Sequence, residues 1–588
     1  MKILITLSLA LSTILNVFGQ TNYYVDPVNG NNAFNGTSLG AAWKTIQKAC
    51  DAATPNSIVQ IKGGTYYENL VVNVSGTNGN PITFKNYMNE SVIIDGTGTT
   101  GTTLLNITDK SYLTFKNLTF QNLTKNNAQG ILVECSAGGT VTSLLFRKLV
   151  VKNIRWTANA SATPTSNNNA QAFIAYGRGT TSAKAIANLV IDSCDFYNNV
   201  TGFSEVLSLD GNIDGFTVTN NNVHHNTNIG IYAGGNYGEC SIPSLDHARN
   251  GTIEKNNCYK NVSLYATSGG IYADGAQNVI IRRNICYRNG YGIEVGCEEN
   301  GTTDNITVIN NLLFRNLDCG IAVGGYTTST TGQVLNSIFR NNTLFQNDSS
   351  KNGSGEFYIT KASNCVFKNN LVYTNSENVL FSVENISPQA SNTFNYNCWF
   401  TPQNNANDIT VNWKTANYSS FSAYKTGTSQ DANSFYSNPK LVNTILVNPD
   451  LHIQTLSPCV NSGDPVTTVL GSETDYDGNA RAVSTIDIGA FEYAVIPIIS
   501  EISSIENNKV PMFVYPNPFS SQATLFSGIE LKNASLAIYN LAGNEVKKVE
   551  NISGFQIPLD GDNLPVGLLI FKVEQDSKVI STGKLIVE

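Results

Sequence analysis

Charged residues are scarce in this chain of 588 residues, since Asp, Glu, Lys and Arg together make up 14% of it. The net charge of −8 lacks the basic excess that a nucleic-acid-binding protein needs, so we expect no nucleic-acid partner. No Cys-x-x-Cys pair and no Cys/His spacing indicates zinc. What the chain has in abundance is Gly, Asn, Thr and Tyr, a composition that suits many short strands joined by turns.

Long apolar runs are also missing beyond the N-terminus, and we expect no transmembrane segment. Met1-Lys2 precedes an apolar run over 3–14, and a small residue, Gly19, follows. These features predict a secretory signal peptide, 1–19, that is too short to anchor the protein in a membrane. We therefore expect an exported, monomeric protein, either secreted or attached to the cell surface.

The central part of the chain repeats itself at intervals of 27 to 35 residues. A period in this range, with β-branched residues and no helical spacing, predicts a solenoid whose coils bury their apolar faces against one another. Asn at the corners favours a parallel β-helix, because its side chain tolerates left-handed backbone and can bond to the next coil. The repeated text is NNVHHN (221–226), NNCYKN (256–261), NICYRN (284–289), NLLFRN (311–316), NTLFQN (342–347) and NLVYTN (370–375).

The eleven cysteines form no obvious disulfide framework. Cys258 and Cys286 share a column of the repeat that holds Val or Leu in other copies, so we interpret them as small buried apolar residues. Neighbouring coils would also permit a disulfide between them. The odd number of cysteines implies at least one free thiol.

The segment before the repeats has apolar residues at Trp43, Ile46, Ala49, Cys50 and Ala53, the spacing of a short amphipathic helix. With the text YVDPVNGNN, WKTIQKA and IVQIKGGTYYE, it resembles the start of secreted right-handed parallel β-helix proteins of the pectate-lyase-like superfold, many of which act on polysaccharides. By that resemblance the helix caps the open end of the solenoid. The text of 438–493 resembles the closing segment of the same proteins, so we predict a β-helix with a C-terminal cap over 20–493.

A linker over 494–509 leads to a separate module, 510–588, with alternating, strand-like text and tight Gly turns. The motifs YPNP, YNLAGNEV and PVG and the final strand at Lys584-Leu585 resemble the C-terminal sorting domain of the type IX secretion system. The resemblance implies that the secretion machinery is a partner and that the module is removed or exchanged for a surface anchor. The alternative is a small immunoglobulin-like sandwich that binds a ligand. The predicted fold is thus all-β, a right-handed parallel β-helix followed by a small β-sandwich.

Short tags close to the repeats place acidic residues on one outer face of the solenoid. The tags are GIYAGG (230–235), GIYADG (270–275), GIEVGC (292–297) and GIAVGG (320–325), preceded by VLSLDG (206–211). Strand alternation puts their Ile, Ala and Val inside and the residues between them outside. The outward set contains Asp210, Tyr232, Tyr272, Asp274 and Glu294, on a floor of glycines that would let a sugar ring approach the backbone.

Two of these carboxylates have the spacing of a catalytic pair. One rung and two residues separate Asp274 from Glu294, which gives a Cα separation of roughly 8 Å. Inverting glycosidases keep their carboxyl groups about 6.5–9.5 Å apart. Asp210 and Asp274, two rungs apart at about 9.6 Å, form an equally feasible pair. The alternative is that Asp210 and Asp274, each followed by Gly, are turn residues, whereas Glu294 has no role in a turn.

The longest repeat carries an extra loop, 236–251, which leaves the same face and is expected to fold over it. Its Asp246, His247 and Arg249 are candidates for binding substrate, as are His224 and His225 nearby; Tyr232 and Tyr272 are candidates for stacking on a sugar. The alternative is a solvated insertion held by an Asp–Arg pair. Glu298, Glu299 and Asp304 add negative charge that could hold Ca²⁺, although no ordered ligand spacing is present and we expect no required cofactor.

A basic column, His225, Lys260, Arg288 and Arg315, occupies the fifth position of the Asn repeat. It is either a solvated edge or a binding site for an anionic glycan. The compact Asp clusters of polysaccharide lyases and the NTD, DD and GHG motifs of polygalacturonases are absent. The sequence therefore predicts a secreted glycoside hydrolase acting on a polysaccharide or complex glycan. The alternatives are a Ca²⁺-assisted polysaccharide lyase and a non-catalytic adhesin or glycan-binding protein.

Overall fold

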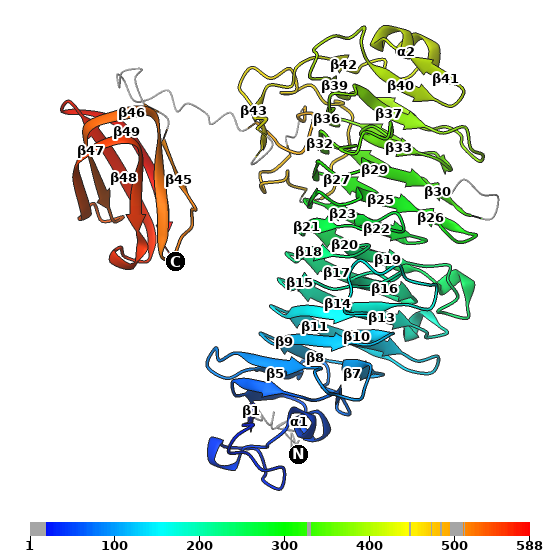
Figure 1. Cartoon of the computed structure of the whole chain (residues 1–588), viewed down its shortest axis with the longest axis vertical. Coiled ribbons are helices and arrows are strands. Elements are labelled where there is room, and N and C mark those ends of the chain that lie inside the picture. Colours follow the sequence, from blue (N-terminus) through cyan, green and yellow to red (C-terminus); the bar gives the residue numbers. More distant parts are fainter. Residues whose placement is uncertain are drawn as a thin grey trace, which may run out of the picture. The chain divides into compact units, whose positions relative to one another are not determined.

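A computed structural model describes residues 19–325, 331–445, 449–471, 473–481, 485–493, 510 and 512–587. The predicted signal peptide, apart from Gly19, and the predicted linker lie outside the described residues. The chain divides into two compact units, Met1–Ala494 and Val495–Glu588. The first unit is a parallel β-helix, and Figure 1 shows its strands stacked coil upon coil. The all-β fold class is confirmed.

Three sheets form the walls of the solenoid, and successive strands of the chain visit them in turn, so each coil contributes one strand to each sheet. Sheet 1 runs in the order β1 (Thr21–Val25), β2 (Ser57–Ile61), β5 (Ile82–Asn86), β8 (Leu113–Lys116), β11 (Val141–Arg147), β14 (Ile186–Asp192), β17 (Ile213–Thr219), β20 (Ala248–Glu254), β23 (Gln277–Arg282), β27 (Thr307–Ile309), β31 (Ile338–Arg340), β35 (Val366–Lys368) and β38 (Thr393–Asn395), with β26 (Thr302–Asp304), β30 (Gln333–Leu335) and β34 (Ala362–Ser363) beside this path.

Sheet 2 comprises β4 (Leu70–Val71), β7 (Thr103–Thr108), β10 (Ala128–Cys135), β13 (Ala170–Gly177), β16 (Leu207–Gly211), β19 (Ile231–Gly234), β22 (Gly269–Asp274), β25 (Tyr291–Gly296), β29 (Cys319–Gly324), β33 (Phe357–Ile359), β37 (Val379–Val383), β40 (Thr410–Trp413) and β41 (Ala416–Tyr418). Sheet 3 comprises β3 (Gly64–Tyr66), β6 (Val92–Asp95), β9 (Thr119–Thr124), β12 (Val150–Arg155), β15 (Asp195–Tyr197), β18 (Asn222–Asn226), β21 (Asn257–Asn261), β24 (Ile285–Tyr287), β28 (Leu312–Phe314), β32 (Thr343–Phe345), β36 (Leu371–Tyr373), β39 (Cys398–Phe400) and β42 (Phe435–Tyr436).

The interior of the solenoid is one continuous apolar core of stacked, inward-facing side chains. Phe84, Phe115 and Phe146 stack in successive coils with ring centroids 4.9 and 5.7 Å apart, because parallel pairing in register sets equivalent residues one rung apart. The eleven cysteines are all buried and free, and Cys258 and Cys286 face each other on paired strands. Their interpretation as small buried apolar residues is confirmed.

Two ladders of buried asparagines hold the corners on either side of sheet 3. In each ladder the side-chain amide donates to the amide oxygen of the next coil and to a backbone carbonyl of the preceding coil, as Asn284 does to Asn311 (3.0 Å) and Ile253 (2.9 Å). The left-handed backbone lies one residue earlier, at Asn, Lys, Arg, His, Gln or Tyr. The ladders are Asn221, Asn256, Asn284, Asn311, Asn342, Asn370, Asn397, and Asn199, Asn226, Asn261, Asn289, Asn316, Asn347.

A helix lies at each end of the solenoid (Figure 1). The predicted N-terminal helix is α1 (Ile46–Ala52), capped by the Thr45 hydroxyl, which accepts from the Lys48 N–H, and it buries Ile46, Ala49 and Cys50. A second helix, α2 (Phe421–Thr428), was not evident from the sequence. It buries Phe421 and Tyr424 beside the last coils, where Tyr424 packs edge-on against Phe381. Each helix covers apolar side chains that the coils at its end of the solenoid would otherwise expose.

Residues 438–493, here called the fold-back segment, do not cap the end of the solenoid as predicted. After β43 (Leu441–Asn443) and β44 (Asp450–Ile453), the segment runs along the outer face of sheet 3 and covers Leu312, Phe314 and Leu371 with Ile488 and Phe491. A buried ion pair between Arg340 and Glu473 fastens it to the solenoid. Outward-facing apolar residues on sheet 3 provide the physical reason for this path, because they need a cover.

The second unit has its own apolar core and one antiparallel sheet, whose strands are β45 (Met512–Tyr515), β46 (Gln522–Tyr539), β47 (Glu545–Asp560), β48 (Gly567–Gln575) and β49 (Lys578–Val587). The start of β46 pairs with β45 and its end with β48, while β47 follows it on the other edge with several register shifts.

Candidate functional site

Sheet 2 aligns the outward-facing residues in the columns that the sequence predicted. Tyr232 pairs with Tyr272, and Tyr272 with Glu294; the next residues of this column are Ala322 and Tyr358. In the second column Gly234 pairs with Asp274, and Asp274 with Gly296. The pairing is parallel and without a shift, so side chains from five consecutive coils share one face.

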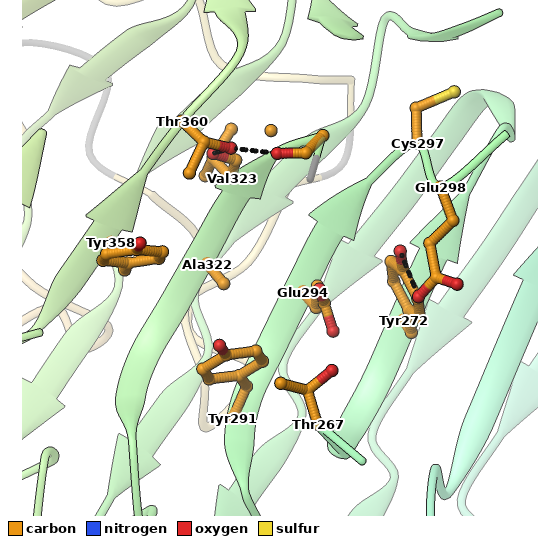
Figure 2. A pocket seen from close by; sticks show the side chains of 12 residues that line it. Thr267, Tyr272, Tyr291, Glu294, Cys297, Glu298, Ala322, Val323, Tyr358 and Thr360 are labelled. Carbon is orange, nitrogen blue, oxygen red and sulfur yellow. Dashed lines mark hydrogen bonds between the residues drawn. The ribbon is translucent and has the colours of Figure 1, made fainter. Parts of the chain in front are cut away.

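A pocket of about 290 Å³ lies on this face over β22, β25, β29 and β33. Figure 2 shows Glu294 near its middle, with Tyr291 and Thr267 on one side and Glu298 and Tyr272 on the other. No Lys, Arg or His is among the described residues that line it. The lining residues are Thr267, Tyr272, Tyr291, Glu294, Cys297, Glu298, Ala322, Val323, Gly324, Gly325, Tyr358 and Thr360.

Glu294 projects from the middle of β25 into the pocket and is partly exposed. Surrounding protein atoms, together with the negative charges of Glu298, Asp274 and Asp318, raise the pKa of Glu294 well above its ordinary value. This shift favours the protonated form of the carboxyl group, which can donate a proton to a bound molecule.

Glu298, just beyond β25, is the second carboxyl group in the pocket. Its Oε1 accepts from the Tyr272 hydroxyl at 3.3 Å and its Oε2 from the Tyr237 hydroxyl at 3.5 Å. Burial and the nearby Asp274 charge raise its pKa to about 7, while the two tyrosine hydroxyls favour the charged form. Glu298 therefore has access to the ionised state at neutral pH.

Asp274 faces outward as predicted but is only 1% exposed, and it does not line the pocket. Its Oδ2 accepts from Tyr237 at 2.6 Å and from Tyr232 at 3.1 Å, and its Oδ1 accepts from the Glu298 N–H at 2.9 Å. Burial raises its pKa to about 6, and these three donors oppose that shift. Asp274 thus holds in place Tyr237 and the start of the segment that carries Glu298. This role differs from that of a turn residue and from that of a residue that lines the pocket.

Tyr232 and Tyr272 are 4% and 2% exposed, so their rings are not available for stacking on a sugar, contrary to the prediction. The ring of Tyr232 lies over Gly234 and that of Tyr272 over Gly296. The glycine floor therefore makes room for tyrosine rings rather than for a sugar. The rings whose exposed parts line the pocket are Tyr291 and Tyr358.

Asp210, at the end of β16, extends the acidic face toward the N-terminal coils. Its Oδ1 is buried without a hydrogen-bond partner among the described residues, and burial with the charges of Glu239, Asp246 and Asp274 raises its pKa to about 8. Glu205, which the sequence did not single out, has its pKa raised to about 8 by burial and by Asp210. Neither residue lines the pocket around Glu294.

The loop 236–251 reaches this face through Tyr237 rather than through the residues predicted to bind substrate. Asp246 is buried and accepts from the Gly238 and Cys240 N–H groups, so it shapes the loop. His247 is buried with Nδ1 bound to the Gly275 carbonyl at 2.7 Å. Arg249 lies on β20 of sheet 1 and pairs with Asp214 at 3.1 Å. These three side chains are satisfied within the protein.

His224 and His225 lie on β18 in sheet 3, so the structure does not bring them to this face. The Ca²⁺ candidates do not converge either. Asp304 lies on β26 beside sheet 1 and accepts from Asn336 at 2.8 Å, whereas Glu298 turns into the pocket. Among the residues that the structure describes, no group of three or more His, Cys, Asp or Glu side chains could hold a metal ion.

Sequence reasoning missed Glu298 as a partner of Glu294, and it missed Tyr237, Tyr291 and Tyr358 altogether. Tyr358 shares the column of Glu294, but its repeat lacks the Gly-Ile tag that defined the alignment. Tyr291 could have been found, since it directly precedes the tag at 292–297 and begins β25. The contacts of Tyr237 depend on the path of the loop, which has no signal in the sequence.

Two segments match known protein families. Residues 165–343 match the right handed beta helix region, and residues 513–588 match the secretion system C-terminal sorting domain. The sorting domain identifies the chain as a type IX secretion substrate that is exported to the cell surface or the medium. In the described part of the chain, no helix has the length and apolarity to cross a membrane.

Comparison with individual proteins gives three further similarities. Pectate lyase PEL9 of Emericella nidulans is 41% identical over 81 residues, which cover 13% of this chain and 19% of that protein. The crystal structure of pectate lyase Pel9A aligns with a TM-score of 0.42 and 16% identity, covering 82% of this chain and 98% of that one. The structure of the GH136 lacto-N-biosidase from Eubacterium ramulus aligns with a TM-score of 0.38 and 13% identity, covering 65% of this chain and 64% of that one.

A longer similarity covers most of the β-helix. The protein YwoF of Bacillus subtilis (strain 168), described as uncharacterized, is 32% identical over 443 residues, which span 73% of this chain and 90% of YwoF. With this extent of identity over nearly the whole relative, the chain belongs to the protein family of YwoF.

Proposed function

We propose that the protein is an exported glycoside hydrolase that cleaves a neutral polysaccharide or complex glycan in the pocket over Glu294 and Glu298. The observation that carries this proposal is the presence of two carboxyl groups with different hydrogen-bonding environments in one pocket whose described lining has no cationic side chain. Glycoside hydrolysis needs such a pair, one protonated and one ionised.

Glu294 is the proposed general acid, because burial and neighbouring negative charges keep its proton in place. It donates this proton to the glycosidic oxygen as the bond from that oxygen to the anomeric carbon breaks. Glu298, ionised and bound to the Tyr272 and Tyr237 hydroxyls, either takes a proton from the attacking water or attacks the anomeric carbon itself. In both cases one water molecule is consumed for each bond that is cleaved.

Tyr291 and Tyr358 are the proposed platform for the sugar rings. Both line the pocket on the side of Glu294 away from Glu298, and both are partly exposed (Figure 2). An aromatic ring offers an apolar face that packs against the C–H groups of a sugar while its hydroxyl bonds to water or sugar. Asp274 and Tyr237 are proposed positioning residues, since they hold the Glu298 segment without lining the pocket themselves.

The charge of the pocket favours a neutral substrate over a uronate polymer. A substrate carboxylate near the ionised Glu298 and Asp274 would be repelled, because no Lys, Arg or His among the described lining residues would compensate for it. A polysaccharide lyase needs a cation to neutralise that carboxylate, so the hydrolase is the better supported of the two. The local similarity to a pectate lyase supports a carbohydrate polymer as the class of substrate.

The test is a panel of neutral and acidic glycans assayed for new reducing ends with the wild-type chain and with Glu294→Gln, Glu298→Gln and Glu254→Gln. Glu254 is the matched control, because it faces outward from a strand of sheet 1 and pairs with Arg282 at 2.7 Å. We expect Glu294→Gln and Glu298→Gln to lower kcat by about 100-fold or more at unchanged melting temperature, and Glu254→Gln to retain activity.

Other outcomes would point to other functions. Products with unsaturated, ultraviolet-absorbing ends and loss of activity in chelator would identify a lyase. Binding of a glycan without the release of reducing ends from any member of the panel would identify a binding protein. The anomer of the first product, read by NMR, tells whether water or Glu298 attacks the anomeric carbon.

A further inference from the structure

A second groove, of about 800 Å³, lies on sheet 3 between the solenoid and the fold-back segment, and it shares no residue with the pocket over Glu294. Its floor consists of Ile285, Tyr287, Leu312 and Phe314. The wall on the fold-back segment includes Leu451, His452, Tyr476 and Phe491. The groove thus combines an apolar floor with polar walls, which is the usual anatomy of a ligand site.

A row of stacked rings leads out of this groove along the solenoid. Phe314 and Tyr287 stack with centroids 4.8 Å apart, Tyr287 and Tyr259 at 4.9 Å, and Tyr259 and His224 at 4.7 Å. The fold-back segment covers Phe314, whereas Tyr287, Tyr259 and His224 remain partly exposed. Because the ring faces are used in stacking, the exposed parts are ring edges and hydroxyl groups, set at the rung spacing of the coils.

Cationic side chains stand on both sides of this row. Lys255 and Arg283 occupy the corner before sheet 3, and Arg288 occupies the corner after it, all three with left-handed backbone. Arg283 is held by the Tyr476 carbonyl and the Thr474 hydroxyl. Lys255 and Arg288 are exposed and form no ion pair with any residue that the structure describes. The groove therefore offers positive charge that no protein carboxylate neutralises.

On the opposite wall His452 offsets one of two carboxylates, Asp450 and Asp477, so the wall carries less negative charge than the three cations of the solenoid carry positive charge. Asp450, the one carboxylate lining the groove among the described residues, binds His452 Nδ1 at 2.5 Å, and Asp477 binds His452 Nε2 at 2.8 Å. These two partners raise the pKa of His452 to about 9 although burial opposes them, so the imidazole is charged at neutral pH. Three cationic side chains and a charged histidine thus line a groove on a chain whose net charge is −8.

We propose that this groove is a non-catalytic binding site for a carboxylate-bearing oligosaccharide, such as a stretch of uronate residues. Lys255 and Arg288 contact the carboxylates, and the edges and hydroxyls of Tyr287 and Tyr259 bond to the sugar hydroxyls. Carboxylates match the groove because ammonium and guanidinium groups donate charge-assisted hydrogen bonds to them. The same acidic sugars are disfavoured in the pocket over Glu294, so the two sites differ in the class of saccharide that they take.

The test is calorimetric titration of the full chain with an oligouronate, a sulfated oligosaccharide and a neutral oligosaccharide of matching length. The variants are Lys255→Asn and Arg288→Asn, singly and combined, since Asn occupies the equivalent left-handed corners at Asn220 and Asn198. Lys148→Asn is the matched control, an exposed left-handed corner cation three coils away, at about 14 Å.

We expect the oligouronate to bind, the double variant to bind about tenfold more weakly, and Lys148→Asn to bind as the wild type does. Binding should also weaken as salt is raised. Glu294→Gln should bind the oligouronate unchanged, which separates this site from the proposed catalytic one. Equal affinity for the neutral oligosaccharide, binding of the sulfated probe alone, or equal losses in the double variant and Lys148→Asn would overturn the proposal.

Discussion

The ring of Tyr272 covers the backbone of Gly296 in the next coil so closely that a β carbon there would lie 2.7 Å from the tyrosine hydroxyl oxygen. That hydroxyl donates to Glu298, which lines the pocket beside Glu294. The absence of a side chain at residue 296 thus decides where a carboxylate of the candidate site lies. It does so through the Tyr272 ring, which lies between Gly296 and Glu298.

We therefore expect Gly296→Ala to displace the Tyr272 ring and, with it, the Glu298 carboxylate. The added methyl group must displace the Tyr272 ring, which is packed on all sides, and such overpacking costs about 1–3 kcal/mol of stability. We expect a lower melting temperature. We also expect a loss of kcat that is larger than the unfolded fraction of the variant explains. Gly138→Ala is the control, because a β carbon at Gly138 meets no atom within 4 Å. A fully active, stable Gly296→Ala protein would contradict this relationship.

Asp274→Asn should shift the pH dependence of activity. The Asp274 charge raises the pKa of Glu298, whose pKa is about 7, so its removal lowers that pKa. In the wild type, activity should rise as pH increases through about 7, when Glu298 ionises, and fall at higher pH, when Glu294 loses its proton. In Asp274→Asn the rising limb should move to lower pH. Profiles of kcat against pH measure this, and an unshifted limb would assign Asp274 a purely structural role.

Asn284→Ala should destabilise the solenoid strongly. The Asn284 side chain donates to the Ile253 carbonyl and the Asn311 amide oxygen and accepts from Asn256, all in the buried interior. Its removal leaves several buried polar groups unsatisfied, at about 1–3 kcal/mol each. Asn106→Ala is the control, since Asn106 is partly exposed on β7 and accepts one bond from Thr108. Denaturant unfolding of both variants measures the difference, and equal midpoints would refute the role of the ladder.

His452 should make the attachment of the fold-back segment sensitive to alkaline pH. Its pKa is raised from 6.5 to about 9 by Asp450 and Asp477, so the folded state binds the proton more tightly than the unfolded state does. The resulting stability is fully present below about pH 6.5 and is lost as pH rises through about 9. Hydrogen exchange of residues 449–453 should accelerate between pH 7 and pH 10, after correction for the intrinsic rate. His452→Gln should lack this change; if it keeps the same pH dependence, another group is responsible.

The sequence by itself determined the solenoid, the columns of sheet 2 and the identity of the second unit. Apolar residues that recur with the coil, and corner asparagines that bond to the equivalent asparagine one rung away, favour one register. For this reason Glu294 could be placed beside Tyr272 and outside the core from the text of four tags. The burial of Cys258 and Cys286 followed from the same periodicity, and the N-terminal helix followed from the helical spacing of its own apolar residues.

Only the tertiary structure decided which outward residues line the pocket. Asp274 and Glu294 both face outward by the sequence alignment, yet Tyr237, from a loop without periodicity, bonds to the first, whereas the second lines the pocket. Glu298 enters the pocket because its N–H is bound by Asp274, a contact between two coils that spacing does not specify. The fold-back segment likewise creates its groove by packing on residues more than 100 positions earlier. A repeated sequence specifies the contacts between equivalent positions of neighbouring coils. The loops and the fold-back segment have no repeat, so the positions of their side chains depend on how they pack against the solenoid.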